Sequence, residues 1–294
     1  MHISTFRELR LFTICSAVSV HDSAPLVQNR QPGAFECVDV DIEVCIPPRG
    51  SRQSMSPLTV FEIAKKLNTH GVVLLRGSSL FSEVALEGAH AAVEAALQRV
   101  QLAAAAQQVV ETPWSHTRGQ RQSVRFQFQE AVSFSPGRLD LPTLLGEAPF
   151  NTSIEVGGWR DRSDLLALCK QTFDGEECRQ RRLGALYNFP SSFDTDWHRD
   201  GMDEIMTIFT ATDALPANVG WPKFALVDRP ECHVNAVLAA GESVIFKYET
   251  MHAPTPNHGA VPRMLVYSLY GTARAHDRLN YPADLPSLFA GVSQ

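Results

Sequence analysis

The segment DTDWHRDGMDEI, residues 194–205, contains two overlapping patterns that could perform chemistry. His198-Arg199-Asp200 matches the start of the catalytic loop of protein kinases, in which the aspartate acts as a base. His198 and Asp200 also stand two residues apart, a spacing that places an imidazole and a carboxylate on one face of a strand. The first pattern predicts phosphoryl transfer, and the second predicts a metal site.

The kinase interpretation fails on its supporting motifs. The kinase loop continues H-R-D-L-x-x-x-N, and its asparagine binds a second magnesium ion. Gly201 follows the aspartate here, and Ile205 stands where that asparagine is required. The sequence has no D-F-G or A-P-E after this point and no glycine-rich nucleotide loop before it. We therefore exclude a kinase.

The metal interpretation gains a third ligand further along the chain. His198 and Asp200 would supply two ligands of a 2-His-1-carboxylate triad, which leaves positions open on a non-haem Fe(II). Alone, the pair is more typical of a surface histidine and a turn aspartate than of a metal site, because the chain has ten histidines and one such pair arises easily by chance. His252 ends the apolar run SVIFKYETM, so it can point inward at the mouth of a β-barrel.

Arg263 begins the apolar run RMLVYSLY. A charged side chain is rarely buried without a partner, and a guanidinium matches a carboxylate in a bidentate manner. The arginine therefore predicts a carboxylate partner inside the barrel. The alternative is an arginine at a strand edge that is solvated by water.

These residues require a scaffold, which the sequence predicts in two parts. Residues 1–55 form a partly irregular N-terminal extension with one strand at 35–46, and a single domain spans 56–294. Ser56, Pro57 and Gly71 predict the cap, first turn and end of a helix. Strands are expected at 72–77 and 123–134, and helices at 81–108 and 162–173.

From residue 183 onward, short β-branched and aromatic runs are separated by turn residues. Strands are expected at 183–189, 204–212, 223–228, 242–249 and 264–270. Regularly spaced strands predict an antiparallel sandwich or barrel that follows the helices.

Composition limits the partners. The net charge of −6 and the lack of a long basic run argue against nucleic acid. No stretch approaches the ~20 apolar residues of a membrane span. The six cysteines form no C-x-x-C pair, which favours reduced thiols in a cytoplasmic protein. Residues 1–24 have the outline of a weak targeting segment.

The order W-H-R-D, then G-E-S-V-I-F, then His252 with Asn257 five and Arg263 eleven residues later, resembles the phytanoyl-CoA dioxygenase family of Fe(II)/2-oxoglutarate-dependent oxygenases. The segment LNTHGVVLLRG resembles the family's opening helix and strand. ALPANVGWPKFALVD resembles its turn and strand, with the glycine displaced by one residue. The likeness covers about residues 58–275.

The resemblance implies an α+β fold, with a double-stranded β-helix (jelly-roll) core and N-terminal helices packed on one face. It implies that His198, Asp200 and His252 hold Fe(II), and that Arg263 binds the far carboxylate of 2-oxoglutarate. With O2, decarboxylation of that co-substrate would be coupled to hydroxylation of a small-molecule or lipid-like substrate. Asp200 favours oxygenation over halogenation, because related halogenases lack this carboxylate.

One position departs from the family pattern. Many relatives have Ser or Thr two residues after the distal histidine, where this chain has Pro254. Thr255 or Tyr187 would then supply the missing hydroxyl. The weaker candidates for binding substrate are Arg125, Gln127, Arg138 and Trp221.

Two other functions stay open from the sequence. The chain could be a non-catalytic jelly-roll binding protein, or a zinc-dependent hydrolase or isomerase that uses the same ligands. Arg263 favours the oxygenase, since a zinc hydrolase needs no buried carboxylate partner. The identity of the substrate and the oligomeric state do not follow from the sequence.

Overall fold

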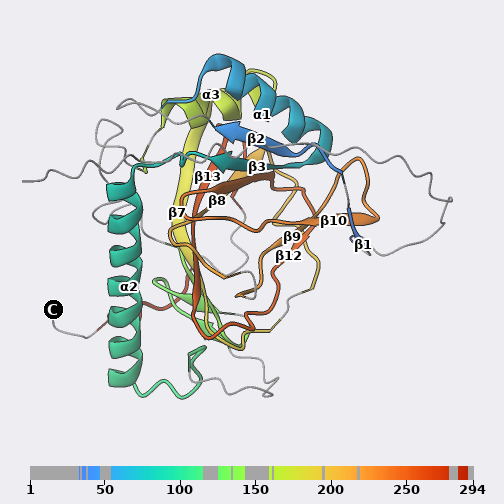
Figure 1. Ribbon diagram of the computed structural model, residues 1–294. Helices are drawn as coiled ribbons and strands as arrows, with labels where there is room; N and C mark the ends of the chain where they lie inside the picture. The colour runs from blue at the N-terminus through green and yellow to red at the C-terminus, as the bar shows by residue number, and fades with distance from the viewer. Residues whose placement is uncertain are drawn as a thin grey trace, which may run out of the picture.

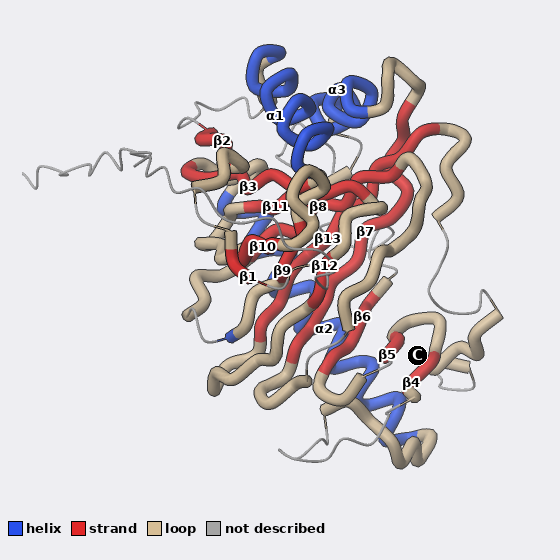
Figure 2. Tube along the Cα trace, turned by 90° about the vertical axis from the view of Figure 1, so that its right-hand side faces the viewer, coloured by secondary structure: helices blue, strands red, loops and turns tan. Residues whose placement is uncertain are grey.

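Two β-sheets of unequal size face each other in the computed structural model (Figures 1 and 2). The structure describes residues 33, 35–37, 39–46, 54–114, 125–133, 135–142, 159, 160, 162–193, 196–216, 219–277 and 284–290. The larger sheet has nine strands in the order β2-β3-β11-β8-β13-β7-β6-β5-β4. The smaller sheet has four strands in the order β1-β10-β9-β12.

The strands of the larger sheet are β2 (Glu43–Ile46), β3 (Val72–Gly77), β4 (Phe126–Gln127), β5 (Val132–Ser133), β6 (Arg138–Leu141), β7 (Cys178–Asn188), β8 (Ile205–Ala211), β11 (Ser243–Lys247) and β13 (Arg263–Thr272). The strands of the smaller sheet are β1 (Phe35–Glu36), β9 (Lys223–Ala225), β10 (Cys232–Asn235) and β12 (His252–Ala253). Pairing is parallel between β2 and β3 and between β1 and β10, and antiparallel between the other neighbours.

Three helices complete the described part of the fold: α1 (Pro57–His70), α2 (Glu83–Ala106) and α3 (Ser163–Thr172). The predicted limits of α1 are confirmed, because the Ser56 side chain accepts from the Thr59 backbone N–H and Gly71 ends the helix at φ 79°. Ser82 caps α2 in the same way through the Ala85 N–H. Figure 1 shows α2 along one side of the larger sheet, with α1 and α3 across one end.

The larger sheet has two faces that bury different cores. Met264 and Val266 of β13 share one hydrophobic cluster with buried residues of all three helices. Leu265 and Tyr267, which alternate with them, share a second cluster with Phe224 of the smaller sheet. Residues that alternate along a strand point to opposite faces, so every side chain of β13 has a defined side.

A large mixed sheet with few helices agrees with the predicted jelly-roll class at this coarse level. The details differ from the prediction in three places. The strand expected at 35–46 is two strands, β1 and β2, which belong to different sheets. The strand expected at 123–134 is a hairpin of β4 and β5. Strands β6, β10 and β12 were not predicted.

The expectation of reduced thiols is wrong for four cysteines. Disulfides join Cys37 to Cys232 and Cys169 to Cys178. No local pattern indicates the first pair, because its cysteines are separated by 195 positions and meet only when β1 pairs with β10. Disulfides persist mainly in oxidising compartments, so the thiol argument for a cytoplasmic location no longer holds.

No helix in the described part of the chain is long and apolar enough to cross a membrane.

Candidate metal centre

His198, Asp200 and His252 converge at the inner edge of the smaller sheet. Their ligand atoms all lie within 4.8 Å of one another. Asp200 Oδ1 is 3.9 Å from His198 Nε2 and 3.7 Å from His252 Nε2. His252 is buried, whereas His198 and Asp200 are partly exposed, so one side of the cluster faces solvent.

Backbone hydrogen bonds fix the relative positions of the two histidines. His198 and His252 form an isolated antiparallel bridge, in which each backbone N–H donates to the other's carbonyl at 2.9 Å. Their ring centroids are 4.4 Å apart. The interpretation of residues 198–200 as a strand is therefore only partly right, because the extended backbone is a single bridge residue and the chain bends at Asp200.

The placement of His252 also differs from the prediction. β11 ends at Lys247, a turn follows, and His252 opens β12 in the smaller sheet opposite Phe224. His252 therefore comes from β12 of the smaller sheet, and His198 is a bridge residue paired with it. The apolar run before His252 did not predict the element that contains it.

The ring tautomers are set by backbone carbonyls. His198 Nδ1 is 2.9 Å from the Asp196 carbonyl oxygen, and His252 Nδ1 is 3.0 Å from the Thr250 carbonyl oxygen. A carbonyl can only accept, so Nδ1 carries the hydrogen in each ring. The Nε2 lone pairs then face Asp200, which is the arrangement that metal-binding histidines use.

These three residues fit a divalent metal. An ion at about 2.0–2.2 Å from each ligand atom needs ligand atoms roughly 3–4 Å apart, so the side chains must close by about an ångström or less. Burial lowers the pKa of His252 below its usual range, and the Asp200 charge opposes this effect. A neutral imidazole is the form that binds a metal.

Arg138, Asn188 and Arg263 form a row of hydrogen-bond donors near the three ligands, which we call the donor row. Arg138 of β6 and Arg263 of β13 both pair in register with Asn188, the last residue of β7. Residues paired in this way point to the same face of a sheet. The Arg138 charge contributes to lowering the pKa of both His252 and Arg263, so Arg138 lies near both residues.

Arg263 is 3% exposed, which excludes the interpretation as a solvated edge arginine. Its Nε and Nη1 atoms, and Nδ2 of the buried Asn188, have no hydrogen-bond partner among the described residues. Burial, with the nearby Arg138 charge, lowers the pKa of Arg263 to about 9. The described part of the protein does not supply the predicted carboxylate partner. Buried donors that lack acceptors are suited to binding an anion.

An acidic group sits next to this row. Tyr267 donates its hydroxyl hydrogen to Asp140 Oδ1 at 2.9 Å. Burial raises the pKa of Asp140 to about 6, although the Tyr267 hydrogen bond and the Arg138 charge oppose the rise. Tyr267 reaches β6 across Gly184 of β7, where an added Cβ would lie 2.5 Å from Tyr267 Cζ.

The two hydroxyl candidates do not join the site as expected. Tyr187 points to the opposite face of the larger sheet, where its hydroxyl donates to Glu94 of α2 at 3.1 Å. Thr255 is buried, and its hydroxyl donates to the Trp221 carbonyl at 2.8 Å. The prediction for Tyr187 is therefore wrong, and the Thr255 proton is already engaged.

The weaker candidates separate into inner and outer residues. Arg125 is exposed just before β4, and Gln127 is half-buried in β4. Neither forms a hydrogen bond or ion pair with the three candidate ligands in the described part of the chain. Trp221 is buried in the inner cluster with Nε1 unpaired among the described residues, and Arg138 lies in the donor row.

Sequence reasoning missed Asn188, Asp140 and Tyr267. Asn188 and Tyr267 stand in segments that were recognised as strands, and they looked like ordinary strand residues. Asp140 stands in β6, which was not predicted. The role of Asn188 could have been inferred from its position opposite Arg263 at the end of a strand, but only with the knowledge that β7 pairs with β13.

The loop between His252 and Arg263 is organised by Asn257. Its side-chain Nδ2 donates to the carbonyls of Asn188 and Val261, and its Oδ1 accepts from the Gly259 N–H. Asn257 therefore closes this turn with its own side chain. The loop thereby fixes how far Arg263 lies from β12.

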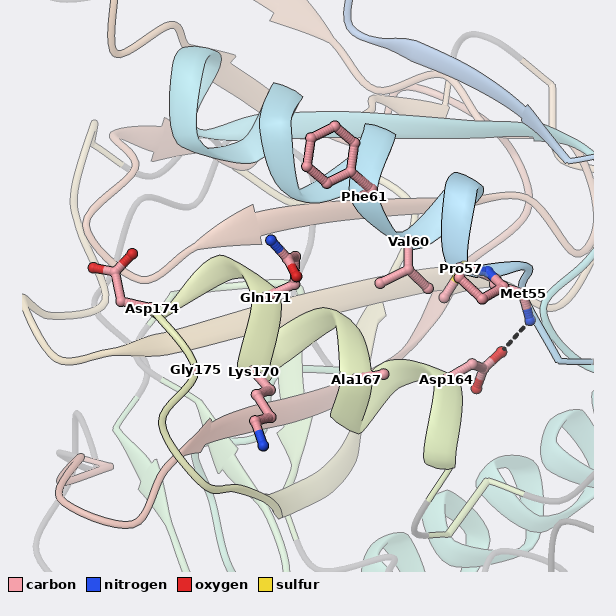
Figure 3. Close-up of a pocket in the computed structure, with 10 residues that line it drawn as sticks. All are labelled: Met55, Pro57, Val60, Phe61, Asp164, Ala167, Lys170, Gln171, Asp174 and Gly175. Carbon is pink, nitrogen blue, oxygen red and sulfur yellow. Dashed lines mark hydrogen bonds between the residues drawn. The ribbon is translucent and has the colours of Figure 1, made fainter.

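A separate cavity of about 480 Å³ lies between α1 and α3 (Figure 3). Val60, Phe61 and Lys170 line it, and Asp164 at its edge accepts from the Met55 N–H at 3.0 Å. The cavity contains none of the three candidate metal ligands and none of the donor row.

Comparison with solved structures shows which fold this is. The non-heme alpha ketoglutarate dependent epimerase SnoN from nogalamycin biosynthesis aligns with 18% identity, 81% of this chain, 93% of its own chain and a TM-score of 0.53. The carbocyclase SnoK from the same biosynthesis, also non-heme and alpha ketoglutarate dependent, aligns with 15% identity, 79% and 89% coverage and a TM-score of 0.51.

No model of a protein family and no curated protein matches the chain. The membership in the phytanoyl-CoA dioxygenase family that the sequence suggested therefore stays a prediction. At identities below 20%, the solved structures show that this chain shares the fold of non-heme alpha ketoglutarate-dependent enzymes.

Proposed function

We propose that the chain is an Fe(II)- and 2-oxoglutarate-dependent oxygenase that acts on a small-molecule or lipid-like substrate. One observation carries the proposal: Arg138 lies near both an open His-Asp-His set and the buried Arg263, whose donors lack a partner among the described residues. A zinc hydrolase would account for the first half of this observation and not for the second.

In this proposal each residue has a separate task. His198, Asp200 and His252 hold the metal through Nε2, a carboxylate oxygen and Nε2. Arg263 binds the far carboxylate of 2-oxoglutarate, and Asn188 Nδ2 donates to the same ligand. Bound Fe(II) would supply the chemistry that couples decarboxylation of 2-oxoglutarate by O2 to oxidation of a substrate C–H bond.

Two further polar groups are candidates for binding the substrate. Arg138 faces Asp140 and Asp200, and its charge is favourable to both. Trp221 Nε1 offers a further donor from the smaller sheet. We assign Arg138 and Trp221 to substrate binding, and we propose hydroxylation as the reaction. The oxygenase domain would span residues 56–294 together with strands β1 and β2.

Succinate release tests the proposal. Purified protein with Fe(II), 2-oxoglutarate and O2 should form succinate, even without substrate, and Zn(II) should not support the reaction. His252→Ala should reduce the rate by at least about 100-fold, the larger effect expected when a ligand itself is lost.

His258→Ala is the matched control, because His258 is exposed in the same loop six positions later. It should leave the rate of succinate formation unchanged. Absence of succinate from the parent protein, or equal loss in both variants, would contradict the proposal.

A further inference from the structure

The segment that precedes β2 packs against the residue next to His198. Gly33 and Phe35–Cys37, which we call the N-terminal clip, lie along β10 at the edge of the smaller sheet (Figure 1). The side chain of Trp197 lies directly over Gly33. A Cβ added at Gly33 would stand 2.5 Å from Trp197 Cη2, closer than real contacts allow.

Hydrogen bonds define the position of the clip. The Gly33 N–H donates to the Pro230 carbonyl at 2.9 Å, and the Cys37 N–H donates to the His233 carbonyl at 2.7 Å. His233 Nδ1 in turn lies 2.9 Å from the Gly33 carbonyl oxygen. The Trp197 and His233 rings have centroids 6.0 Å apart, so Trp197 contacts both the clip and β10.

Strand pairing alone holds the clip weakly, since β1 has only two residues and forms an edge of its sheet. The Cys37–Cys232 disulfide adds a covalent link between the clip and β10. Trp197 is bonded to His198, whose backbone is paired with His252. The clip, Trp197 and the His198–His252 bridge therefore form one continuous set of contacts.

We propose that the N-terminal clip, held by the Cys37–Cys232 disulfide, positions His198 for metal binding through Trp197. The inference rests on the proposed function, because it takes His198 to be a metal ligand. Trp197 is a positioning residue in this proposal, because its contacts are with Gly33 of the clip and with His233 of β10. Loss of the disulfide frees the clip, Trp197 loses its support, and His198 no longer holds its orientation toward Asp200.

The second disulfide provides a matched control. Cys169 and Cys178 join α3 to the start of β7. Asn188 lies ten positions beyond Cys178 along β7, which at 3.3 Å per residue is roughly 33 Å. Removal of this disulfide therefore shows how the loss of a covalent link far from the clip affects metal binding.

The experiment measures the affinity of the full chain for Fe(II) or Co(II) by competition with a chelator. Cys37→Ser/Cys232→Ser should weaken metal binding by roughly 10-fold or more, the size of effects typical of groups that orient ligands. The metal affinity of Cys169→Ser/Cys178→Ser should stay within about twofold of the parent's, because this disulfide does not orient a ligand. Equal affinities in the two double variants would overturn the inference.

A second pair of variants leaves both disulfides in place. Gly33→Ala pushes a methyl group into Trp197. Gly175 has a similar positive φ, but nothing lies within 4 Å of a Cβ added there, so Gly175→Ala carries the same backbone strain without the clash. Gly33→Ala should weaken metal binding and Gly175→Ala should not. Equal affinity of these two variants would also overturn the inference, and circular dichroism confirms that each is folded.

Metal affinity separates this inference from the proposed function. A parent protein that binds metal but forms no succinate would contradict the oxygenase and leave the clip to be judged by the affinities. A parent that forms succinate, with no difference between the paired variants, would contradict the clip alone.

Discussion

Arg263 combines two properties that rarely occur together, a buried charge and hydrogen-bond donors that the described residues do not satisfy. An uncompensated buried charge costs about 3–5 kcal/mol, so a protein retains one when a ligand uses it. We therefore expect the arginine to reduce the stability of the ligand-free protein and to increase its affinity for 2-oxoglutarate.

Arg263→Met tests both effects. Without ligand, the variant should be more stable by roughly 1–3 kcal/mol, measured by chemical denaturation, since part of the gain is lost to imperfect packing. Its affinity for 2-oxoglutarate should fall by about 10- to 100-fold, the value of a lost charge-assisted hydrogen bond. Arg125→Met, at an exposed position, should change neither quantity.

A fall of several kcal/mol in the stability of Arg263→Met would show a structural ion pair at this position. That result would contradict the assignment of Arg263 to an anion.

Asp140 predicts a specific dependence of stability on pH. Burial raises its folded-state pKa to about 6 from an ordinary 3.8. Its contribution to stability is therefore complete below pH 3.8 and is lost as the pH rises through about 6. Asp140→Asn removes the charge, so its unfolding free energy relative to the parent should increase from pH 4 to 6 and level off above. If the difference in unfolding free energy between Asp140→Asn and the parent does not change with pH, the pKa of Asp140 is not raised in the folded protein.

At the scale of single residues, the sequence was informative where the chemistry is encoded in spacing. His198 and Asp200 were selected by their two-residue interval, His252 and Arg263 by their places at the ends of apolar runs, and the family resemblance joined the four. Asn188 escaped because its role depends on strand pairing, which no local interval reveals.

At the scale of elements, β7 carries a glycine where the inner face needs space. Tyr267 of β13 lies across Gly184 and reaches Asp140 of β6. An added Cβ at Gly184 would also stand 2.6 Å from the Leu141 carbonyl oxygen. The bond between Tyr267 and Asp140 therefore depends on the absence of a side chain at residue 184.

Gly184→Ala should destabilise the protein by about 1–3 kcal/mol, because the extra methyl group forces neighbouring groups to move. Chemical denaturation measures the change. Alanine is otherwise favoured over glycine in a strand by roughly 0.5–1 kcal/mol. A variant that is more stable than the parent would therefore show that Tyr267 can move without cost, and that its bond to Asp140 does not depend on glycine at residue 184.

Elements were predictable from sequence in proportion to their length. The helix at 57–70 and the strand at 72–77 were found because caps and apolar runs mark them locally. The two-residue strands β1, β4, β5 and β12 have no period to detect, and they exist because neighbouring strands supply hydrogen-bond partners. His252 lies in one of these, so its residue was predictable and its element was not.

At the scale of the whole molecule, the two disulfides close loops of very different length. Cys37 and Cys232 are separated by 195 positions, and Cys169 and Cys178 by 9. A chain-entropy argument gives about 5 kcal/mol for the long loop and about 2.5 kcal/mol for the short one. The long link connects the N-terminal part of the chain to the sheet that carries His252.

Thermal unfolding of the two double serine variants checks this order. Cys37→Ser/Cys232→Ser should lower the Tm by about twice as much as Cys169→Ser/Cys178→Ser, if the chain-entropy argument holds. The opposite order would indicate that native-state packing around α3 outweighs loop length.

Binding of Fe(II) and 2-oxoglutarate without oxygen tests the central claim most directly. Titration of 2-oxoglutarate into anaerobic protein loaded with Fe(II) should produce a weak visible charge-transfer band that saturates at one equivalent. Asp200→Ala should abolish the band through loss of metal, and Arg263→Met should shift its midpoint to higher 2-oxoglutarate concentration. A parent protein with fully loaded iron and no such band would contradict the claim that this site is the centre of a 2-oxoglutarate-dependent oxygenase.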